Sequence, residues 1–409
     1  YAYGGDFNRF DASDVNFCDN GLISPDRVPN PHMYEVGYFY QNIWTSPVNI
    51  KNGEISIFNE YFFRDLSAYY LEWQVLKGGE IMRSGRVEDL NVGPQQTVKM
   101  KLPIGKTCQC SEWLLNVAYK LKNTEGLLPA GHTIAKQQLV LNPYKAPSME
   151  LKNQAKSNWE VVEPTLKEND ERYLIVDGEN FRIEFDKTNG YLSKYQVNGL
   201  DMLKEGSYLQ PNFWRGPNDN DYGNGQPKRE QIWKQSSKNF KVADVITEAD
   251  GNNTVLTANY LLAAGNLYIV KYTIYPDGVV HADITFTSTD MEEGKTEVSE
   301  ATLMATFSPG QQEARRAASK LVVPRIGVRF RLPADMNQVE YFGRGPGENY
   351  IDRQRASHID LYKTTADAMY TNNYVRPQEN GHRTDTRWVE LTRKNGKGLK
   401  IVADNTIGF

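Results

Sequence analysis

The stretch that decides the fold reads Glu54-Ile55-Ser56-Ile57-Phe58-Asn59-Glu60-Tyr61-Phe62-Phe63, and it alternates polar and apolar side chains before it breaks at Arg64-Asp65. Because successive side chains of a strand point to opposite faces, this alternation predicts a strand with one buried face. Three further strands are predicted at 70–76, 112–122 and 133–141. Lys77-Gly78-Gly79-Glu80 is typical of a hairpin turn. Short alternating strands with turns between them over 45–145 indicate an immunoglobulin-like β-sandwich.

A second strand-rich region follows the linker Asn142-Pro143-Tyr144-Lys145-Ala146-Pro147. Its predicted strands are 181–185, 191–195, 268–275 and 279–287. Asn189-Gly190 joins the first two strands, and this dipeptide favours the positive φ angles of a type I′ turn. No helix longer than three turns is evident, so residues 146–409 are predicted to form a large antiparallel sandwich.

The first 44 residues follow a different pattern. Asn30-Pro31-His32 is typical of a helix start with proline in the first turn. Residues 33–43 then predict one amphipathic helix with Met33, Val36, Tyr40 and Ile43 on one stripe. A loop and a short apolar stretch followed by a helix are typical of the end of an α/β barrel. The predicted fold is therefore mainly β, with a barrel tail at 1–44 and two sandwiches at 45–145 and 146–409.

Composition excludes several classes of partner. The net charge is −4 and no basic block occurs, which argues against nucleic acid because phosphate binding needs clustered Lys and Arg. No apolar run approaches the ~20 residues of a membrane helix.

Cys18, Cys108 and Cys110 are predicted to be unpaired, since Cys108-Gln109-Cys110 would place two thiols on one strand face, too close for an easy disulfide. The compartment stays open between the cytoplasm and a bacterial periplasm.

Five motifs occur in a fixed order along the chain. They are Tyr1-Ala2-Tyr3-Gly4-Gly5-Asp6-Phe7 with Phe17-Cys18-Asp19-Asn20-Gly21-Leu22, Ala130-Gly131-His132, Arg215-Gly216-Pro217-Asn218-Asp219-Asn220-Asp221, the run 343–353 and the run 374–383. Together they resemble β-galactosidases of glycoside hydrolase family 2. The resemblance covers the full chain: the barrel's last strand and loop, the second immunoglobulin-like domain, and a terminal supersandwich that some bacteria encode as a small subunit.

The resemblance implies a retaining β-galactosidase that hydrolyses terminal β-D-galactose residues with two glutamates, one acid/base and one nucleophile. Both glutamates precede the segment that matches this chain, so no catalytic residue is expected here and the chain alone is expected to be inactive. Asn59-Glu60 mimics the family's Asn-Glu acid/base pair. Its position in a sandwich strand, not at the end of a barrel strand, favours a structural role.

What the resemblance implies for this chain is half of a galactose site. The residues that match Phe17 and Asn20 hold a sodium ion in the family, through a backbone carbonyl and a side-chain oxygen, and the ion contacts the galactose 6-hydroxyl. Oxygen ligands of low charge suit such a hard monovalent cation. The carboxylate ligand comes from upstream, so the sodium site is incomplete, and Asp14 helps to shape the loop. The alternative is that Asn20-Gly21 only forms a turn after a buried Phe.

Two further positions allow functional and structural interpretations. Trp214 is a candidate sugar platform, and Asp219 and Asp221 are candidate oxygen ligands for magnesium or calcium. A turn whose Asx side chains bond their own backbone is the favoured alternative for this run. Gly199 matches a glycine at the start of a mobile loop that borders the family's active site, and a plain turn explains it equally well.

The run Gly343-Arg344-Gly345-Pro346-Gly347 follows a predicted strand, and it lacks the helix start that a dinucleotide loop would need. Near it, four side chains are candidates for a buried network of ion pairs and amides: Arg353, Glu379, Asn380 and Arg383. Such a network would lock the second sandwich. The alternative is that they face the barrel.

The favoured function is therefore part of a β-galactosidase that completes the galactose subsite and braces the barrel. Its expected partners are a β-galactoside, the N-terminal barrel half of the same enzyme and further copies in a homo-oligomer. Two other classes of function stay open. One is a non-catalytic carbohydrate-binding β protein, and the other is a purely structural or assembly region.

Overall fold

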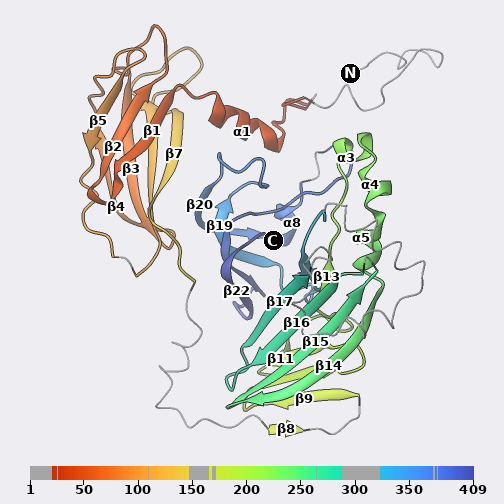
Figure 1. Ribbon diagram of the computed structural model, residues 1–409. Helices are drawn as coiled ribbons and strands as arrows, with labels where there is room; N and C mark the ends of the chain where they lie inside the picture. The colour runs from red at the N-terminus through yellow and green to blue at the C-terminus, as the bar shows by residue number, and fades with distance from the viewer. Residues whose placement is uncertain are drawn as a thin grey trace, which may run out of the picture. The chain divides into compact units, whose positions relative to one another are not determined.

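The computed structural model describes residues 21–24, 26–108, 110–146, 165–167, 172–263, 265–287, 323–371, 374 and 376–409. These residues form six antiparallel sheets and a few short helices (Figure 1), which confirms the mainly β prediction. They divide into two compact units, Tyr1–Gln154 with Asn337–Phe409 and Ala155–Met336. The domain boundaries expected from the sequence, 1–44, 45–145 and 146–409, stay predictions.

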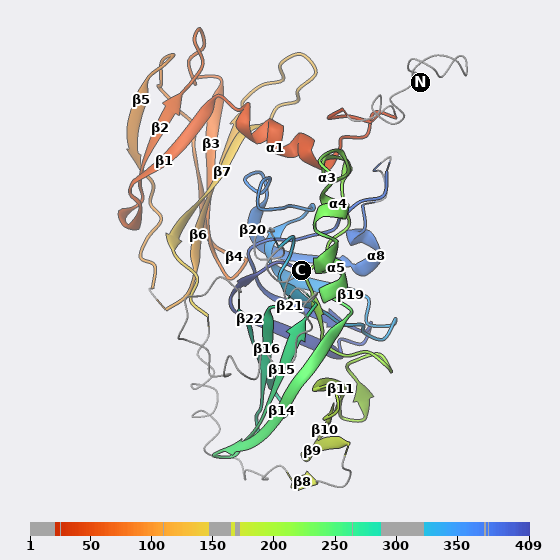
Figure 2. The same ribbon diagram turned by 45° about the vertical axis from the view of Figure 1, so that its right-hand side comes forward.

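The predicted first sandwich is present and has seven strands. One sheet has the order β1-β2-β5 and the other β4-β3-β6-β7 (Figure 2). The strands are β1 Ile43–Asn49, β2 Glu54–Asn59, β3 Tyr69–Lys77, β4 Glu80–Val87, β5 Thr97–Lys101, β6 Trp113–Leu121 and β7 Thr133–Asn142. Side chains from both sheets share one core, for example Ile55 with Trp73 and Tyr119. Burial alternates along β2 as the sequence pattern predicts, and the immunoglobulin-like classification stays a prediction.

Two turns show where positive φ angles are used. Gly78 and Gly79, at φ 58° and 86°, join β3 to β4 and confirm the predicted hairpin. The hairpin at Asn189-Gly190 is also present, but only Gly190 has a positive φ, 69°, so the predicted type I′ turn is wrong there. The amides of Asn189 and Gly190 both donate to the carbonyl of Asp186, which closes a longer turn.

The helix predicted over 33–43 is shorter than expected. Helix α1 covers Pro31–Phe39 and has no buried residue. Ile43 begins β1 and is 0% exposed in the sandwich core, so it does not continue the helical stripe. The chain leaves the helix at Gln41, whose side chain accepts the backbone N–H of Lys136 in β7 at 2.9 Å. Tertiary contacts with the sandwich therefore end the helix before its apolar periodicity ends.

The end of the chain forms a four-stranded sheet in the same unit. Its order is β20-β19-β21-β22, with β19 Gln338–Gly345, β20 His358–Thr365, β21 Thr386–Thr392 and β22 Gly398–Ile407, and the short helix α8 Ala366–Met369 follows β20. This terminal sheet packs on the first sandwich through a small apolar cluster that includes Leu114 and Phe342. Next to it, Arg387 pairs with Glu112, at 2.5 Å between Nη2 and Oε1, with both side chains over 90% buried.

The other unit is a second antiparallel sandwich. A five-stranded sheet has the order β12-β11-β10-β9-β8, and a four-stranded sheet β14-β15-β16-β17 faces it (Figure 1). The strands are β8 Thr165–Lys167, β9 Tyr173–Asp177, β10 Phe181–Asp186, β11 Tyr191–Val197, β12 Leu200–Asp201, β14 Phe240–Asp250, β15 Asn253–Leu262, β16 Leu267–Ile274 and β17 Val280–Thr287. Buried tyrosines and phenylalanines fill the core between them. A small sheet pairs β13 Gln210–Asn212 with β18 Gly327–Arg329, and helices α3 Asp219–Gly223, α4 Gln226–Arg229 and α5 Gln231–Ser236 follow β13.

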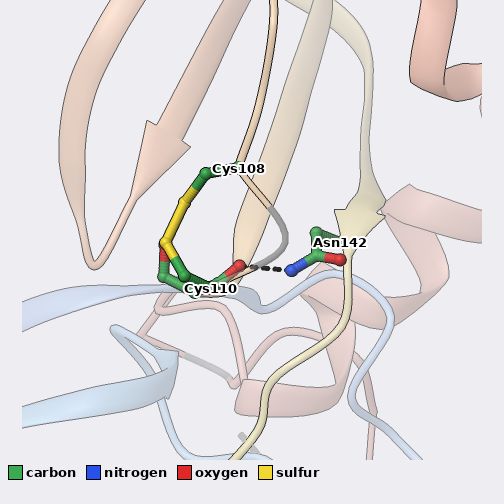
Figure 3. The surroundings of a disulfide bond; sticks show 4 residues. Cys108, Cys110 and Asn142 are labelled. Atoms are coloured by element: carbon green, nitrogen blue, oxygen red, sulfur yellow. Dashed lines mark hydrogen bonds between the residues drawn. A yellow bond between two sulfur atoms is a disulfide. The ribbon is translucent and has the colours of Figure 1, made fainter.

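The prediction of unpaired thiols is wrong for Cys108 and Cys110, which form a disulfide (Figure 3). The prediction assumed a regular strand at this point. Cys108 and Cys110 lie in no strand, and their Cα atoms are 5.4 Å apart. That spacing lies within the usual range for a disulfide. Cys18 lies outside the described residues.

Candidate functional site

The predicted galactose and sodium residues Asp14, Phe17 and Asn20 lie outside the described residues. The segment directly after them is ordered by Asn30, which is 6% exposed. Its Nδ2 donates to the carbonyl of Gly21 at 2.8 Å, and its Oδ1 accepts from Ser24 Oγ at 3.1 Å. Asn30 therefore fixes the loop that follows the predicted sodium ligands. It also occupies the N-cap of α1 without a side-chain capping bond.

The side chains of Asn59 and Glu60, the pair that mimics the family's acid/base motif, form hydrogen bonds within the first sandwich. Asn59 is 0% exposed, and its Nδ2 donates to the carbonyls of Arg64 and Val92 at 2.8 and 3.1 Å. Its Oδ1 accepts the backbone N–H of Tyr61 at 3.0 Å. Glu60 accepts from the Trp44 indole N–H at 2.7 Å. Both side chains hold the loop after β2, in agreement with the structural role expected from the sequence.

The Arg215 to Asp221 run begins helix α3. Asn218 caps that helix, and its side chain and the Asp221 side chain each accept the other residue's backbone N–H at 2.9 Å. The guanidinium of Arg215 binds both carboxylate oxygens of Asp221, at 2.5 and 2.9 Å. Burial of Asp221 favours its neutral form, but the bonds from Arg215 and from the Asn218 N–H outweigh it and hold the pKa below its usual value. These contacts favour the structural interpretation of the run.

The structure describes both Trp214 and Gly199. Trp214 is half-buried and packs against the core of the second sandwich, with Lys234 Nζ 5.8 Å from its ring centroid. Asn198 and Gly199, at φ 51° and 75°, form the two-residue turn between β11 and β12. A plain turn therefore accounts for Gly199. The sugar-binding roles of both residues stay predictions.

In the part of the chain that the structure describes, no three His, Cys, Asp or Glu side chains gather as a potential metal site. Within the same residues, no helix has the length and apolar character needed to cross a membrane. Asp219 and Asp221 therefore remain candidate metal ligands from the sequence pattern only.

The best-developed polar centre is the carboxylate of Glu348, in the loop after β19, whose side chain is 1% exposed. Four donors converge on it: Arg353 Nη2, the Tyr374 hydroxyl, Thr371 Oγ1 at 2.8 Å and the backbone N–H of Gly381 at 2.8 Å. Burial favours the neutral acid, but these hydrogen bonds outweigh it and lower the pKa of Glu348. The carboxylate joins three loop segments of the terminal sheet.

Two neighbours extend this centre. Asn349 is 0% exposed and bonds the carbonyls of Arg344 and Gly347, each at 3.1 Å, as well as the N–H of Thr384 at 2.9 Å. Asn380 Oδ1 accepts the N–H of Thr371 at 3.2 Å.

Of the four residues expected to form a buried network, Arg353 and Asn380 do so, but the central acid is Glu348, which was not among them. Arg383 bonds instead to the Tyr341 hydroxyl and to two backbone carbonyls, and the part expected of Glu379 stays a prediction. The available signal for Glu348 was its place five residues before Arg353 in a Gly-Pro-rich loop.

Together, these features define a mainly β protein of two sandwiches whose polar motifs order its loops. The family model described as "Beta galactosidase small chain" matches residues 177–407, more than half of the chain. A second model, "Beta-galactosidase, domain 4", matches residues 55–142. The chain therefore belongs to the β-galactosidase small-chain family.

Curated relatives match nearly the whole chain. The β-galactosidase of Priestia megaterium is 30% identical over 98% of this chain and 35% of its own length. That of Halalkalibacterium halodurans is 29% identical over 98% of this chain and 36% of its own length. That of Lactobacillus delbrueckii subsp. bulgaricus is 27% identical, with coverages of 98% and 35%. The chain thus spans about a third of the length of these relatives, and the family expected from the sequence is confirmed.

Proposed function

We propose that this chain is part of a retaining β-galactosidase that hydrolyses terminal β-D-galactose residues. The observation that carries the proposal is the match to proteins named β-galactosidase along 98% of the chain, in the same order of parts. Since those relatives are about three times as long, the proposal places the two catalytic glutamates outside these 409 residues. The chain by itself is then inactive.

In this proposal the chain completes the galactose subsite. Phe17 and Asn20 supply a carbonyl and an amide oxygen to a sodium ion, Asp14 shapes their loop, and Asn30 supports it through Gly21. Gly199 and Trp214 border the sugar. A divalent ion at Asp219 and Asp221 is the weaker alternative for that loop, because Arg215 and the Asn218 N–H already bind the Asp221 carboxylate.

The second part of the role is to brace the barrel half and to contribute to a homo-oligomer. The support is the way in which the first sandwich and the terminal sheet are joined. The buried pair Arg387 and Glu112 links them. The side-chain amide of Gln138 also bonds both the N–H and the carbonyl of Ile359, each at 2.8 Å. Such a joined unit suits a rigid support for a neighbouring domain.

A chimaera tests the proposal. This chain replaces the matched segment of the Priestia megaterium relative, and the hydrolysis of a nitrophenyl β-D-galactoside is measured with and without sodium. We expect the chimaera to hydrolyse the galactoside and sodium to stimulate that hydrolysis. The 409-residue chain alone should show no turnover. Asn20→Ala should raise KM for the galactoside and weaken the sodium response, whereas Asn52→Ala, on an exposed residue of the first sandwich, should change neither.

Two results would count against the proposal. A folded chimaera without turnover, beside an active parent enzyme, would contradict the β-galactosidase assignment. An Asn20→Ala chimaera with unchanged KM and sodium response would contradict the subsite role and leave only the bracing role.

A further inference from the structure

A cavity of about 680 Å³ lies in the unit that contains α1, β7 and the terminal sheet. Residues of α1, β7, β19, β20 and α8 line it. Its ionisable lining consists of four cations and two acids, apart from tyrosines: Lys136, Arg353, Lys363, Arg383, Glu35 and Glu348. The lining therefore has two more positive than negative groups.

Contacts within the protein already use both acids. Glu348 binds Arg353 and three further donors. The two carboxylate oxygens of Glu35 accept the backbone N–H groups of Arg355 and Ala356, each at 2.9 Å. Lys363 pairs with Glu340 on the neighbouring strand at 3.0 Å. None of these acids forms an ion pair with Lys136 or Arg383.

Arg383 is a buried cation with no acid partner among the described residues, and it is only 5% exposed. Its Nε donates to the Tyr341 hydroxyl at 3.1 Å, and its Nη1 donates to the carbonyls of Gly381 and His382 at 3.0 and 3.3 Å. Its Nη2 makes no hydrogen bond to any described residue. A buried charge without a counter-ion is costly, so a ligand that supplies the missing negative charge would be strongly favoured.

Lys136 of β7 presents a second cation to the same cavity, and it too has no ion pair with a described carboxylate. Two partly buried histidines close to these cations add no positive charge near neutral pH. Burial, with the charges of Lys136 and Arg344, lowers the pKa of His358 to about 3. Burial and the charge of Arg353 lower the pKa of His32. Both histidines are therefore neutral near pH 7, and the excess of cations over acids in the lining is what favours an anion.

We propose that this cavity binds a small molecule that carries an oxyanion, either a carboxylate or a phosphate, between Arg383 and Lys136. The free Nη2 edge of Arg383 can donate to an oxyanion, and guanidinium groups bind such groups with strong charge-assisted bonds. Lys136 of β7 adds a second positive charge to the lining. The side chains of Tyr34 and Tyr362 also line the cavity and are available to the rest of the ligand. The volume lies within the range of about 300–1,000 Å³ typical of small-molecule sites.

Calorimetric titration of the 409-residue chain tests the proposal. Inorganic phosphate and citrate are the probes, and sodium chloride keeps the ionic strength constant. We expect saturable binding of at least one probe, with one site per chain. Lys136→Gln should weaken it about tenfold or more, because a charge-assisted bond is lost. Lys99→Gln, on an exposed lysine of β5, is the matched control and should bind as the unmodified chain does.

The outcomes are distinct. Saturation by phosphate alone assigns the site to a phosphate group, and saturation by citrate alone assigns it to carboxylates. Heats of binding that do not saturate with either probe would overturn the proposal, as would equal binding by Lys136→Gln and the unmodified chain. Arg383→Lys keeps the buried charge and removes the guanidinium edge, so it should weaken binding while the circular dichroism spectrum stays unchanged.

Discussion

The Glu348 carboxylate is the residue on which the loops of the terminal sheet depend. Glu348→Gln would leave Arg353, which is 17% exposed, without a charge partner, and an amide cannot accept all four converging donors. Removing one member of a buried pair costs about 3–5 kcal/mol. We expect a loss of that size in urea unfolding followed by circular dichroism. Glu340→Gln removes the partner of the exposed Lys363 and should cost under about 1 kcal/mol.

Glu348→Gln should also change how the free energy of unfolding depends on pH in acid. Since hydrogen bonds hold the folded pKa of Glu348 below its ordinary 4.5, its contribution to stability is present above pH 4.5. It is lost as the pH falls through the folded pKa. The unmodified chain should therefore lose more unfolding free energy than Glu348→Gln between about pH 5 and pH 3. Parallel stability curves for the two proteins would contradict this account.

Sequence patterns located part of this centre. They pointed to Arg353 and Asn380, together with Glu379 and Arg383, because these residues stand in motifs with an unusual density of polar groups. Of these four, Arg353 and Asn380 belong to the Glu348 centre. The patterns missed Glu348, since a single acid in a Gly-Pro-rich loop looks like any solvated charge. Its burial depends on Thr371, Tyr374 and Gly381, which lie 23 to 33 residues further along the chain and so leave no local pattern around Glu348.

At the scale of elements, the turns set the register of the hairpins. Alanine substitutions at their glycines should show how much stability depends on the positive φ angles of these turns. Gly199 is at φ 75° with open space around its Cβ position, so Gly199→Ala should cost about 1–2 kcal/mol from backbone strain alone. Gly190 has φ 69°, and its added Cβ would lie 2.5 Å from Ala258 Cβ, so Gly190→Ala should cost more. Gly327→Ala, with ordinary φ and open space, is the control and should be close to neutral. Urea unfolding measures all three, and equal losses would contradict the ranking.

The strands were predictable from alternation, and the helix end was not. Strands β3, β6, β7, β10 and β16 lie within about two residues of their expected positions, because a half-buried strand has a period that sequence alone displays. The stripe of apolar residues through Ile43 suggested a longer helix α1. Ile43 instead enters the sandwich core, and only the partner strands determine that choice.

At the scale of the whole molecule, strand order carried information that local patterns lack. Strand β19 lies between β20 and β21, and β3 lies between β4 and β6. Motif order identified the family without such knowledge. The side of the first sandwich that meets the terminal sheet was not predictable, since Leu114 and Phe342 look like ordinary core residues of their own sheets.

The junction between the first sandwich and the terminal sheet combines that small apolar cluster with the pair Arg387 and Glu112. Since both side chains are buried, Arg387→Met or Glu112→Leu alone should cost about 3–5 kcal/mol by leaving an uncompensated charge. The double variant should recover most of this loss, because an apolar pair of similar volume avoids the desolvation of two ions.

A double-mutant cycle in urea measures the coupling, and hydrogen exchange at β6 and β21 reports whether the two sheets separate. The exposed pair Arg86 and Glu88 supplies the control cycle, with an expected coupling below about 1 kcal/mol. Additive losses in the double variant at the junction would mean that the pair does not hold the two sheets together. The apolar cluster would then have to do so by itself, although it is far smaller than the core of either sandwich.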